Sequence, residues 1–188
     1  MRIRFAWAVL IAISIVPTIP STSPAGPYFN TTRKEIDAAS REAVKQLSDA
    51  RILVIQMLTD LDMGQFERAR NERVQAVKLL ESSHAQFQDI EAKVPNQPLK
   101  LAPKSDDEKK VVADFADALA ARKLDFPKTE KQLAHLAVIV VIRYSTTIEK
   151  ANLEGFPKNW RGVRDIILSE IDLLTIGNLV SIAWIISE

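Results

Sequence analysis

The fold is decided by residues 32–94, which read TRKEIDAASREAVKQLSDARILVIQMLTDLDMGQFERARNERVQAVKLLESSHAQFQDIEAKV. Apolar residues recur every three or four positions on both sides of the triplet Asp62-Met63-Gly64. That spacing places them on one face of a helix. Gly64 can adopt a positive φ and end the first helix. Because neither apolar face can remain in water, we predict two long helices packed as an antiparallel αα-hairpin.

Two apolar stripes define the faces of this hairpin. The first consists of Ile36, Ala39, Ala43, Val44, Leu47, Ile52, Val54, Ile55, Leu58 and Leu61, and the second of Phe66, Ala69, Val77, Leu80, His84, Phe87 and Val94. From Val77 to Phe87 the second stripe steps in alternate fours and threes, which is the rhythm of packed helices. Thr32 and Glu35 stand in capping-box spacing and predict that the first helix begins there.

The chain beyond the hairpin is divided by prolines. Residues 95–104 contain three of them, which predicts a linker or a strap across the surface. Ser105 and Glu108 repeat the capping-box spacing and predict a third helix. Pro127 suits the first turn of a fourth helix, because proline is tolerated there and not in a helix interior.

The fourth helix contains the most apolar run before the C-terminus, residues 136–142. This run is apolar on every side, so we expect it to be the most enclosed element. Its β-branched residues leave a strand as the alternative. A last break at Gly155-Phe156-Pro157 precedes a final helix, expected from near Asn159 to the end of the chain. Together these patterns predict an all-α bundle of about five helices, built from antiparallel helical hairpins.

The N-terminus has the pattern of a secretory signal peptide. Arg2 and Arg4 precede an apolar run from residue 5 to residue 16, and prolines and small residues follow as far as Ala25. We predict cleavage after Ala25. The expected organisation is a signal peptide at 1–25 and a single bundle domain at 26–188, located in the periplasm or outside the cell. The alternative is an uncleaved anchor, although the apolar run is shorter than the roughly 20 residues that span a bilayer.

Composition excludes several classes of function. The chain has no cysteine, which rules out disulfides, thiolate metal sites, thiol catalysis and acylation of a lipoprotein cysteine. Its formal net charge is +1, close to neutrality, whereas nucleic-acid binding normally requires a basic excess. We therefore expect no nucleic-acid partner. The apolar share of 47% is enough for a core without disulfides.

Four side chains are candidates for binding a ligand or forming an internal ion pair. Arg143 interrupts the apolar run and needs a partner if buried. The candidate carboxylates are Asp60, Asp62, Glu170 and Asp172. The alternative role for Arg143 is to bind an anion, and Tyr144 could join the same network.

The only two imidazoles belong to His84 and His135. An interior histidine is the expected role for His84, and a metal ligand is the alternative. Two ligands on one helix do not make a zinc site, which typically needs four, so no metal or cofactor is predicted. His135 could meet His84 only if their two helices pack side by side.

The C-terminal stretch is the candidate interaction surface. From Leu173 onward the chain is almost wholly apolar, which is typical of a core helix, of a partner or self-association interface, or of peripheral contact with a membrane. Gly177 and Ser181 have the spacing that lets another helix approach closely. The predicted surface residues are Leu173, Gly177, Ser181, Trp184, Phe126 and Phe156, the two phenylalanines lying at breaks between helices.

Two resemblances accompany these patterns. Leu58, Gly64, Phe66 and Ala69 resemble the turn of a tetratricopeptide repeat over about a dozen residues. The order of an early helical hairpin, a Pro-rich linker and an apolar late helix is similar to that of the YfdX-type exported helical proteins. This second resemblance implies stress-related binding rather than catalysis.

The sequence contains none of the familiar catalytic signatures. It lacks a Gly-rich phosphate loop, a Gly-x-Ser-x-Gly elbow and a His-Glu-x-x-His run. We therefore predict an exported binding, chaperone-like or scaffold protein without catalytic residues, acting on a protein or peptide partner. The alternative is a periplasmic sensor that binds a small molecule or an ion inside the bundle, near Arg143 and the two histidines.

Overall fold

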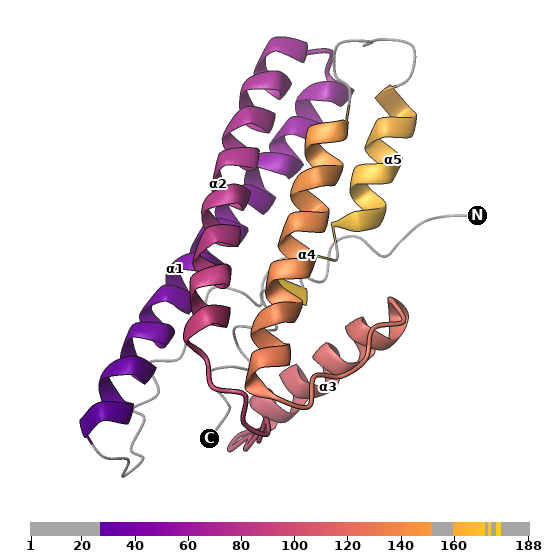
Figure 1. Ribbon diagram of the computed structural model, residues 1–188. Coiled ribbons are helices and arrows are strands. Elements are labelled where there is room, and N and C mark those ends of the chain that lie inside the picture. The colour runs from indigo at the N-terminus through magenta and orange to yellow at the C-terminus, as the bar shows by residue number, and fades with distance from the viewer. Residues whose placement is uncertain (1–26, 152–159, 172, 174–175, 178–188) are drawn as a thin grey trace.

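The computed structural model describes residues 27–151, 160–171, 173, 176 and 177, with side chains from Lys34 onward. Its helices are α1 (Pro27–Asp62), α2 (Phe66–Lys93), α3 (Asp106–Ala121), α4 (Glu130–Lys150) and α5 (Trp160–Glu170). The prediction of an all-α bundle is confirmed. α1 and α2 form a long antiparallel hairpin, α4 lies along α2, and α5 lies beside the upper half of α4 (Figure 1).

The α1–α2 seam is a regular apolar stripe on each helix. The α1 stripe is Ile36, Ser40, Ala43, Leu47, Ala50, Val54, Met57 and Leu61, and the α2 stripe is Ala69, Arg73, Ala76, Leu80, Ser83, Phe87, Ile90 and Val94. Both alternate steps of four and three residues, as packed helices do. Every member except Arg73 is buried. Alanine recurs on both sides, and the hydroxyl of Ser83 donates to the carbonyl of Ala43 at 3.0 Å, so the two backbones approach closely.

The turn between these helices confirms the role expected of Gly64, whose φ is +73°. The amide of Gln65 donates to the carbonyl of Asp60 at 2.8 Å and closes the end of α1. Such a backbone conformation is costly for a residue with a Cβ. The chain therefore reverses at the predicted triplet.

Some details of the predicted hairpin are wrong. α1 begins at Pro27, not at Thr32, since proline is itself favoured in a first turn. Ile52 and Ile55 are exposed although the predicted stripe includes them. On α2 the buried position is Ser83, one residue before His84, which is half-buried. Small residues occupy part of the buried stripe on each helix. The prediction followed the larger apolar side chains beside them, and so placed the buried face slightly rotated about the helix axis.

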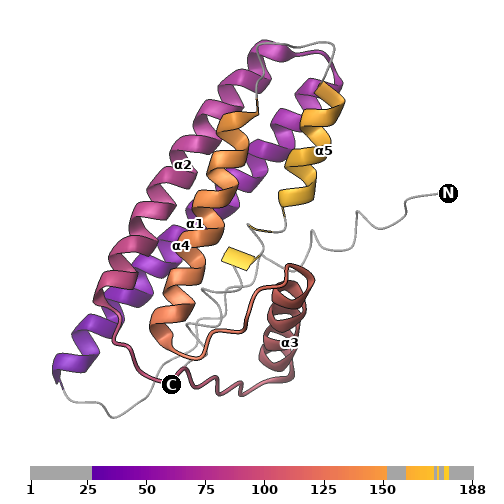
Figure 2. The same ribbon diagram turned by 45° about the vertical axis from the view of Figure 1, so that its right-hand side comes forward.

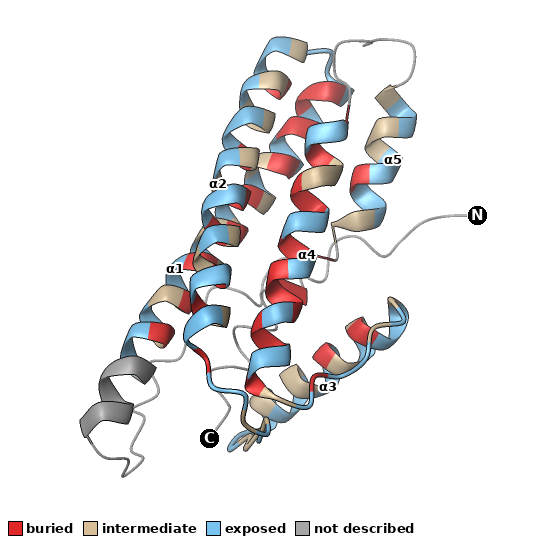
Figure 3. Cartoon of the chain, viewed as in Figure 1, coloured by how far each residue is buried: buried red, intermediate tan, exposed pale blue. Residues whose placement is uncertain are grey.

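α4 is a helix, not a strand, and it packs against α2 along its length. It buries the aromatic side chain of Tyr144 and six large or medium aliphatic side chains: Leu133, Leu136, Val138, Val140, Val141 and Ile148. It is not enclosed on every side, because Ile139 and Ile142 are exposed on its outer face (Figure 3). The helix begins at Glu130 after the N-cap Thr129, so Pro127 precedes the first turn.

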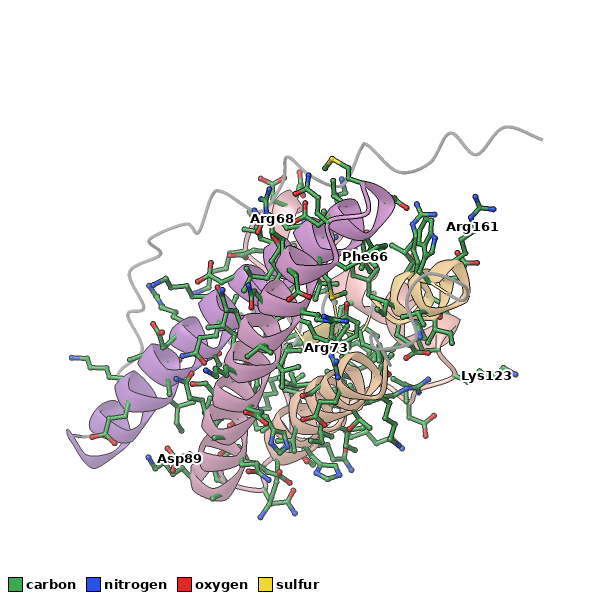
Figure 4. All side chains as sticks on the ribbon, turned by 90° about the horizontal axis from the view of Figure 1, so that it is seen from above. Phe66, Arg68, Arg73, Asp89, Lys123 and Arg161 are labelled. Atoms are coloured by element: carbon green, nitrogen blue, oxygen red, sulfur yellow. The ribbon has the colours of Figure 1, made fainter. Side chains whose placement is uncertain are left out.

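Arg73 ties α2 to the end of α4. Its Nε donates to the carbonyl of Ile148 at 3.1 Å, and its guanidinium also donates to the carbonyl of Glu149. These carbonyls belong to the last turn of α4, where helix carbonyls lack intrahelical donors and attract cations. Figure 4 shows Arg73 pointing from α2 toward α4, in contrast to the outward-pointing Asp89. The polar residue in the α2 stripe is therefore a cap for another helix.

The Pro-rich segment is a strap, which is one of the two forms predicted for it. The amide of Leu99 donates to the carbonyl of Lys128 at 2.9 Å, and the amide of Glu130 donates to the carbonyl of Gln97 at 3.0 Å. The strap thus holds the start of α4 (Figure 2). It leads into α3, which begins with the predicted capping box of Ser105 and Glu108.

The predicted last helix is interrupted after Glu170, with helical backbone again at Leu173, Ile176 and Gly177, and its predicted course beyond Gly177 lies outside the described residues. α5 ends at Glu170, and the amide of Ile171 donates to the carbonyl of Leu168 at 3.4 Å in a tightened turn. Of the residues beyond it, the structure describes Leu173, Ile176 and Gly177, all buried. A Cβ added to Gly177 would lie 2.9 Å from Cδ1 of Leu47. The described part of the apolar C-terminal stretch therefore lies in the core between α1 and α4.

None of the helices, over the residues that are described, is both long enough and apolar enough to cross a membrane.

Candidate functional site

The centre of the candidate site is a carboxylate that lies between two arginines. Glu170, near the end of α5, accepts a hydrogen bond from Arg143 of α4, with a distance of 3.0 Å from Nη2 to Oε1. Arg122, which follows α3, brings Nη1 to 3.4 Å from the same oxygen and donates to the carbonyl of Ser169. Glu170 and Arg122 are largely shielded from solvent, whereas Arg143 is about half exposed. This cluster joins α3, α4 and α5.

The structure selects one of the four partners predicted for Arg143. Glu170 is the one that pairs with it. Asp60 lies 3.2 Å from Nε of Arg68, and Asp62 lies 3.6 Å from Nε of Arg164. Asp172 lies outside the described residues. The choice follows from the antiparallel packing of α5 on α4, which brings the end of α5 opposite the middle of α4.

Tyr144 lies next to this cluster and faces the interior. Its side chain is completely buried, and no described residue forms a hydrogen bond with its hydroxyl. Burial raises the pKa of Tyr144 well above its usual value; the charge of Arg51 lowers that pKa and the charge of Glu170 raises it. The phenol therefore remains protonated and able to donate. Oε2 of Glu170 is also buried without a hydrogen-bond partner in the described part of the chain.

Comparisons with protein-family models, with curated proteins and with solved structures give no match. The two resemblances stated above thus remain predictions. The assignment of the site has to come from the chemistry of the chain itself.

The two histidines are not brought together. Nδ1 of His135, on α4, lies 2.8 Å from Oε1 of Glu91 on α2. His84 is seven residues before Glu91, or about 10 Å along the helix axis. α2 and α4 do pack side by side, but their register brings His135 to Glu91 and not to His84. Among the described residues, there is no group of three or more histidine, aspartate and glutamate side chains that could hold a metal ion.

Only part of the predicted interaction surface can be located. Leu173 and Gly177 are buried within the chain. Phe126 is about two-fifths exposed, and its ring meets that of Phe115 edge-on at 5.3 Å. Phe156, Ser181 and Trp184 lie outside the described residues. The exposed aliphatic side chains that are described lie elsewhere: Ile52, Ile55, Met63, Val74, Ile139, Ile142, Ile166 and Leu168.

A second buried polar group was not predicted. Asp60, in the last turn of α1, is almost completely buried, and its Oδ2, like Oε2 of Glu72 on α2, is buried with no hydrogen-bond partner in the described part of the chain. Burial raises the pKa of Glu72, as does Asp60, while Arg68 lowers it. One proton shared by the two carboxyl groups would satisfy both oxygens.

Sequence reasoning also missed Arg51, Arg73 and Arg122. Arg73 had a recognisable signal, because it interrupts the alternating stripe between Ala69 and Ala76. Arg51 adjoins the stripe residue Ala50, and nothing in the sequence distinguishes it from a solvated arginine. The position of Arg122 depends on how α3 crosses the bundle, which local patterns do not determine.

Proposed function

We propose that the chain is an exported helical protein that binds a protein or peptide partner and performs no catalysis of its own. The observation that carries this proposal is the outer face of α4 and α5. Ile139 and Ile142 are each more than two-fifths exposed on α4, and Ile166 is 59% exposed on α5. Ile139 and Ile142 are three residues apart and so share one face of α4, and exposed aliphatic side chains that share a face favour association.

The charges beside these isoleucines suggest the chemistry of the partner. Arg143 directly follows Ile142 and lies four residues, or about one helical turn, after Ile139, and it keeps about half of its side chain in solvent. An amphipathic helix could place apolar residues against the isoleucines and an acidic residue near this guanidinium. A peptide of leucine and glutamate has that chemistry.

A direct test uses such a peptide. A fluorescein-labelled amphipathic Leu/Glu helix should bind the purified protein, as measured by fluorescence anisotropy, and should bind more tightly than its Leu/Lys counterpart. The double substitution Ile139→Ser and Ile142→Ser should weaken binding at least tenfold. The matched control is the pair Ile52→Ser and Ile55→Ser, which removes two exposed isoleucines from α1. Equal losses in both pairs would contradict a specific surface, and light scattering would detect self-association through the same face.

The export part of the proposal rests on the N-terminal pattern together with the start of α1. The first helix begins at Pro27, two residues after the predicted cleavage point. Mass spectrometry of the protein recovered from a bacterial periplasm or medium should find Gly26 as the first residue. Recovery of an intact N-terminus from the cytoplasm would contradict export.

A second proposed role is that of a sensor for a small molecule. Of the residues that suggested this role, His135 pairs with Glu91 and Arg143 pairs with Glu170. What supports the role is the buried hydroxyl of Tyr144 beside this cluster. The sensor role differs from the first in requiring a ligand that stabilises the folded bundle.

A further inference from the structure

α3 runs alongside none of the other described helices. It lies across the lower end of the molecule, away from the α1–α2 hairpin (Figure 1 and Figure 2). At its start the described hydrogen bonds are local, since Ser105 and Glu108 form the capping box and Lys109 pairs with Asp106 at 2.8 Å. The first turn of α3 therefore needs no other helix to complete its polar contacts.

The end of α3 is tied to the end of α5 by an arginine. Nη1 of Arg122 lies 3.4 Å from Oε1 of Glu170, and Nη2 donates to the carbonyl of Ser169. Carbonyls in the last turn of a helix lack intrahelical donors and attract cations, so Arg122 caps α5 in the way that Arg73 caps α4. Only 18% of the side chain of Arg122 and 18% of that of Glu170 are exposed, so salt screens this pair less than it screens a surface pair.

The turn that follows Arg122 has a strained backbone. Lys123 has a φ of +56°. Its amide donates to the carbonyl of Ala120 at 3.0 Å, and the amide of Leu124 donates to the carbonyl of Leu119 at 2.9 Å. These two bonds form a Schellman motif, in which glycine is the usual residue at the left-handed position. A residue with a Cβ is costly there, and such strain persists only where the surrounding contacts maintain it.

The face of α3 that is turned to the bundle is apolar. Phe115 and Leu119 are almost completely buried. The ring of Phe115 meets that of Phe126 just beyond the turn, and Leu124 packs against the same core. Movement of α3 away from the bundle would therefore uncover two large apolar side chains.

We propose that α3 is a hinged flap, held closed by the contacts of Arg122 with the end of α5, and that its release uncovers Phe115 and Leu119 while the hairpin stays folded. Lys123 is the hinge, because a few residues at the end of an element absorb the backbone change in such motions. Opening relieves the strain at Lys123, whereas the pairing of Arg122 with Glu170 opposes it. The flap is separate from the α4–α5 face and gives the protein an apolar surface that is exposed only on release.

A single introduced thiol reports the opening directly, because the chain contains no cysteine. Leu119→Cys places the thiol on the covered face of α3, and Leu80→Cys places it in the hairpin; Leu119 is 1% exposed and Leu80 0%. Iodoacetamide should label the full purified chain at least about tenfold faster at position 119 than at position 80, because local opening needs less free energy than global unfolding. Equal rates would mean that α3 opens only when the whole bundle unfolds, which would overturn the flap.

Further substitutions in the Leu119→Cys background assign the latch and the hinge. Arg122→Gln removes the ion pair and should speed labelling by about tenfold or more. Lys123→Gly relieves the left-handed backbone of the closed position and should slow labelling by about fivefold. Lys109→Gln, which breaks an exposed pair within α3, is the matched control and should leave the rate unchanged.

Hydrogen exchange followed by mass spectrometry repeats the comparison without a thiol. Amides of residues 106–121 should exchange faster than those of α2, and Arg122→Gln should accelerate the exchange of α3 alone. If Arg122→Gln accelerates α2 equally, or if Lys109→Gln has the same effect as Arg122→Gln, the contact with α5 is not a latch and the proposal is wrong. If Lys123→Gly fails to slow the opening of α3, the strained turn is not its hinge.

Discussion

The α1–α2 seam and the boundary between α4 and α5 are built in opposite ways. The seam is formed by stripes of small and aliphatic side chains, and one hydroxyl reaches across to a backbone carbonyl. At the other boundary Glu170 is shared by Arg143 and Arg122. Apolar burial is non-directional, whereas the strength of a hydrogen bond between charged groups depends on its geometry and on the neighbouring groups. The difference teaches that the hairpin is held by apolar burial, whereas the α4–α5 boundary is held by charged groups whose pairing depends on helix register.

The largest effect should come from breaking the seam. Leu80 is completely buried on α2. Leu80→Ala should lower the free energy of unfolding by about 2–5 kcal/mol, because it removes buried methyl groups and leaves a cavity. Val74→Ala on the same helix is the control; Val74 is 53% exposed, so the loss should be below about 0.5 kcal/mol. Urea denaturation followed by circular dichroism would measure both, and similar losses would refute the apolar seam as the source of stability.

The next effect concerns the charged boundary. Glu170→Gln removes the carboxylate that Arg143 and Arg122 share and should cost about 1.5–3 kcal/mol, the range for hydrogen bonds to charged groups. Asp89→Asn is the control, because Asp89 pairs with Lys93 at 2.6 Å on the exposed surface of α2. Such a surface pair contributes little to stability, because solvent and salt screen it. Equal values in the same urea experiment would mean that the boundary is no stronger than a surface contact.

A smaller effect compares two glycines, one in each region. Gly64→Ala meets no atom within 4 Å, but φ is +73°, so the substitution should cost about 1–2 kcal/mol through backbone strain alone. Gly162→Ala in α5 also meets nothing within 4 Å, and its φ is not positive. It should stabilise the protein by up to about 1 kcal/mol, because alanine favours a helix. Calorimetric Tm values should move in opposite directions; a fall in both would place Gly162 in a strained backbone.

The sequence predicted the elements whose information is local. The turn at Gly64, the capping box at Ser105 and the choice of helices over strands all follow from short patterns. Periodicity also placed Leu80 and Phe87 inside. It misplaced Ile52 and Ile55, because an apolar side chain on the edge of a stripe looks the same in sequence as one at its centre.

The candidate site was predicted less completely because it depends on register between helices. Arg143 needed a carboxylate, and the sequence offered four; only the packing of α5 against α4 selects Glu170. Arg51 had no sequence signal, because its charge acts on the pKa of Tyr144, which lies 93 positions later in the chain. Long-range pairing of polar groups is the part that local patterns cannot supply.

The smallest effect tests the carboxyl groups of Glu72 and Asp60 at the turn end of the hairpin. The pKa of Glu72 is raised above its ordinary value of 4.5 by burial and by Asp60, while Arg68 opposes the shift. Because the folded state holds this proton more tightly than the unfolded state, the stability that it contributes is fully present below about pH 4.5 and is lost as the pH rises through the folded pKa.

Glu72→Gln keeps a hydrogen-bond donor for Asp60 and removes the charge. This variant should therefore be more stable than the native protein at pH 7, by up to about 1 kcal/mol, because solvent screens the partly exposed Glu72. The advantage should shrink as the pH falls toward 4.5. Glu67→Gln, which alters an exposed residue paired with Arg70, should give no stabilisation at pH 7. A Glu72→Gln variant that is less stable at pH 7 would mean that the carboxylate is needed in its charged form, and that Arg68 rather than Asp60 controls this end of the seam.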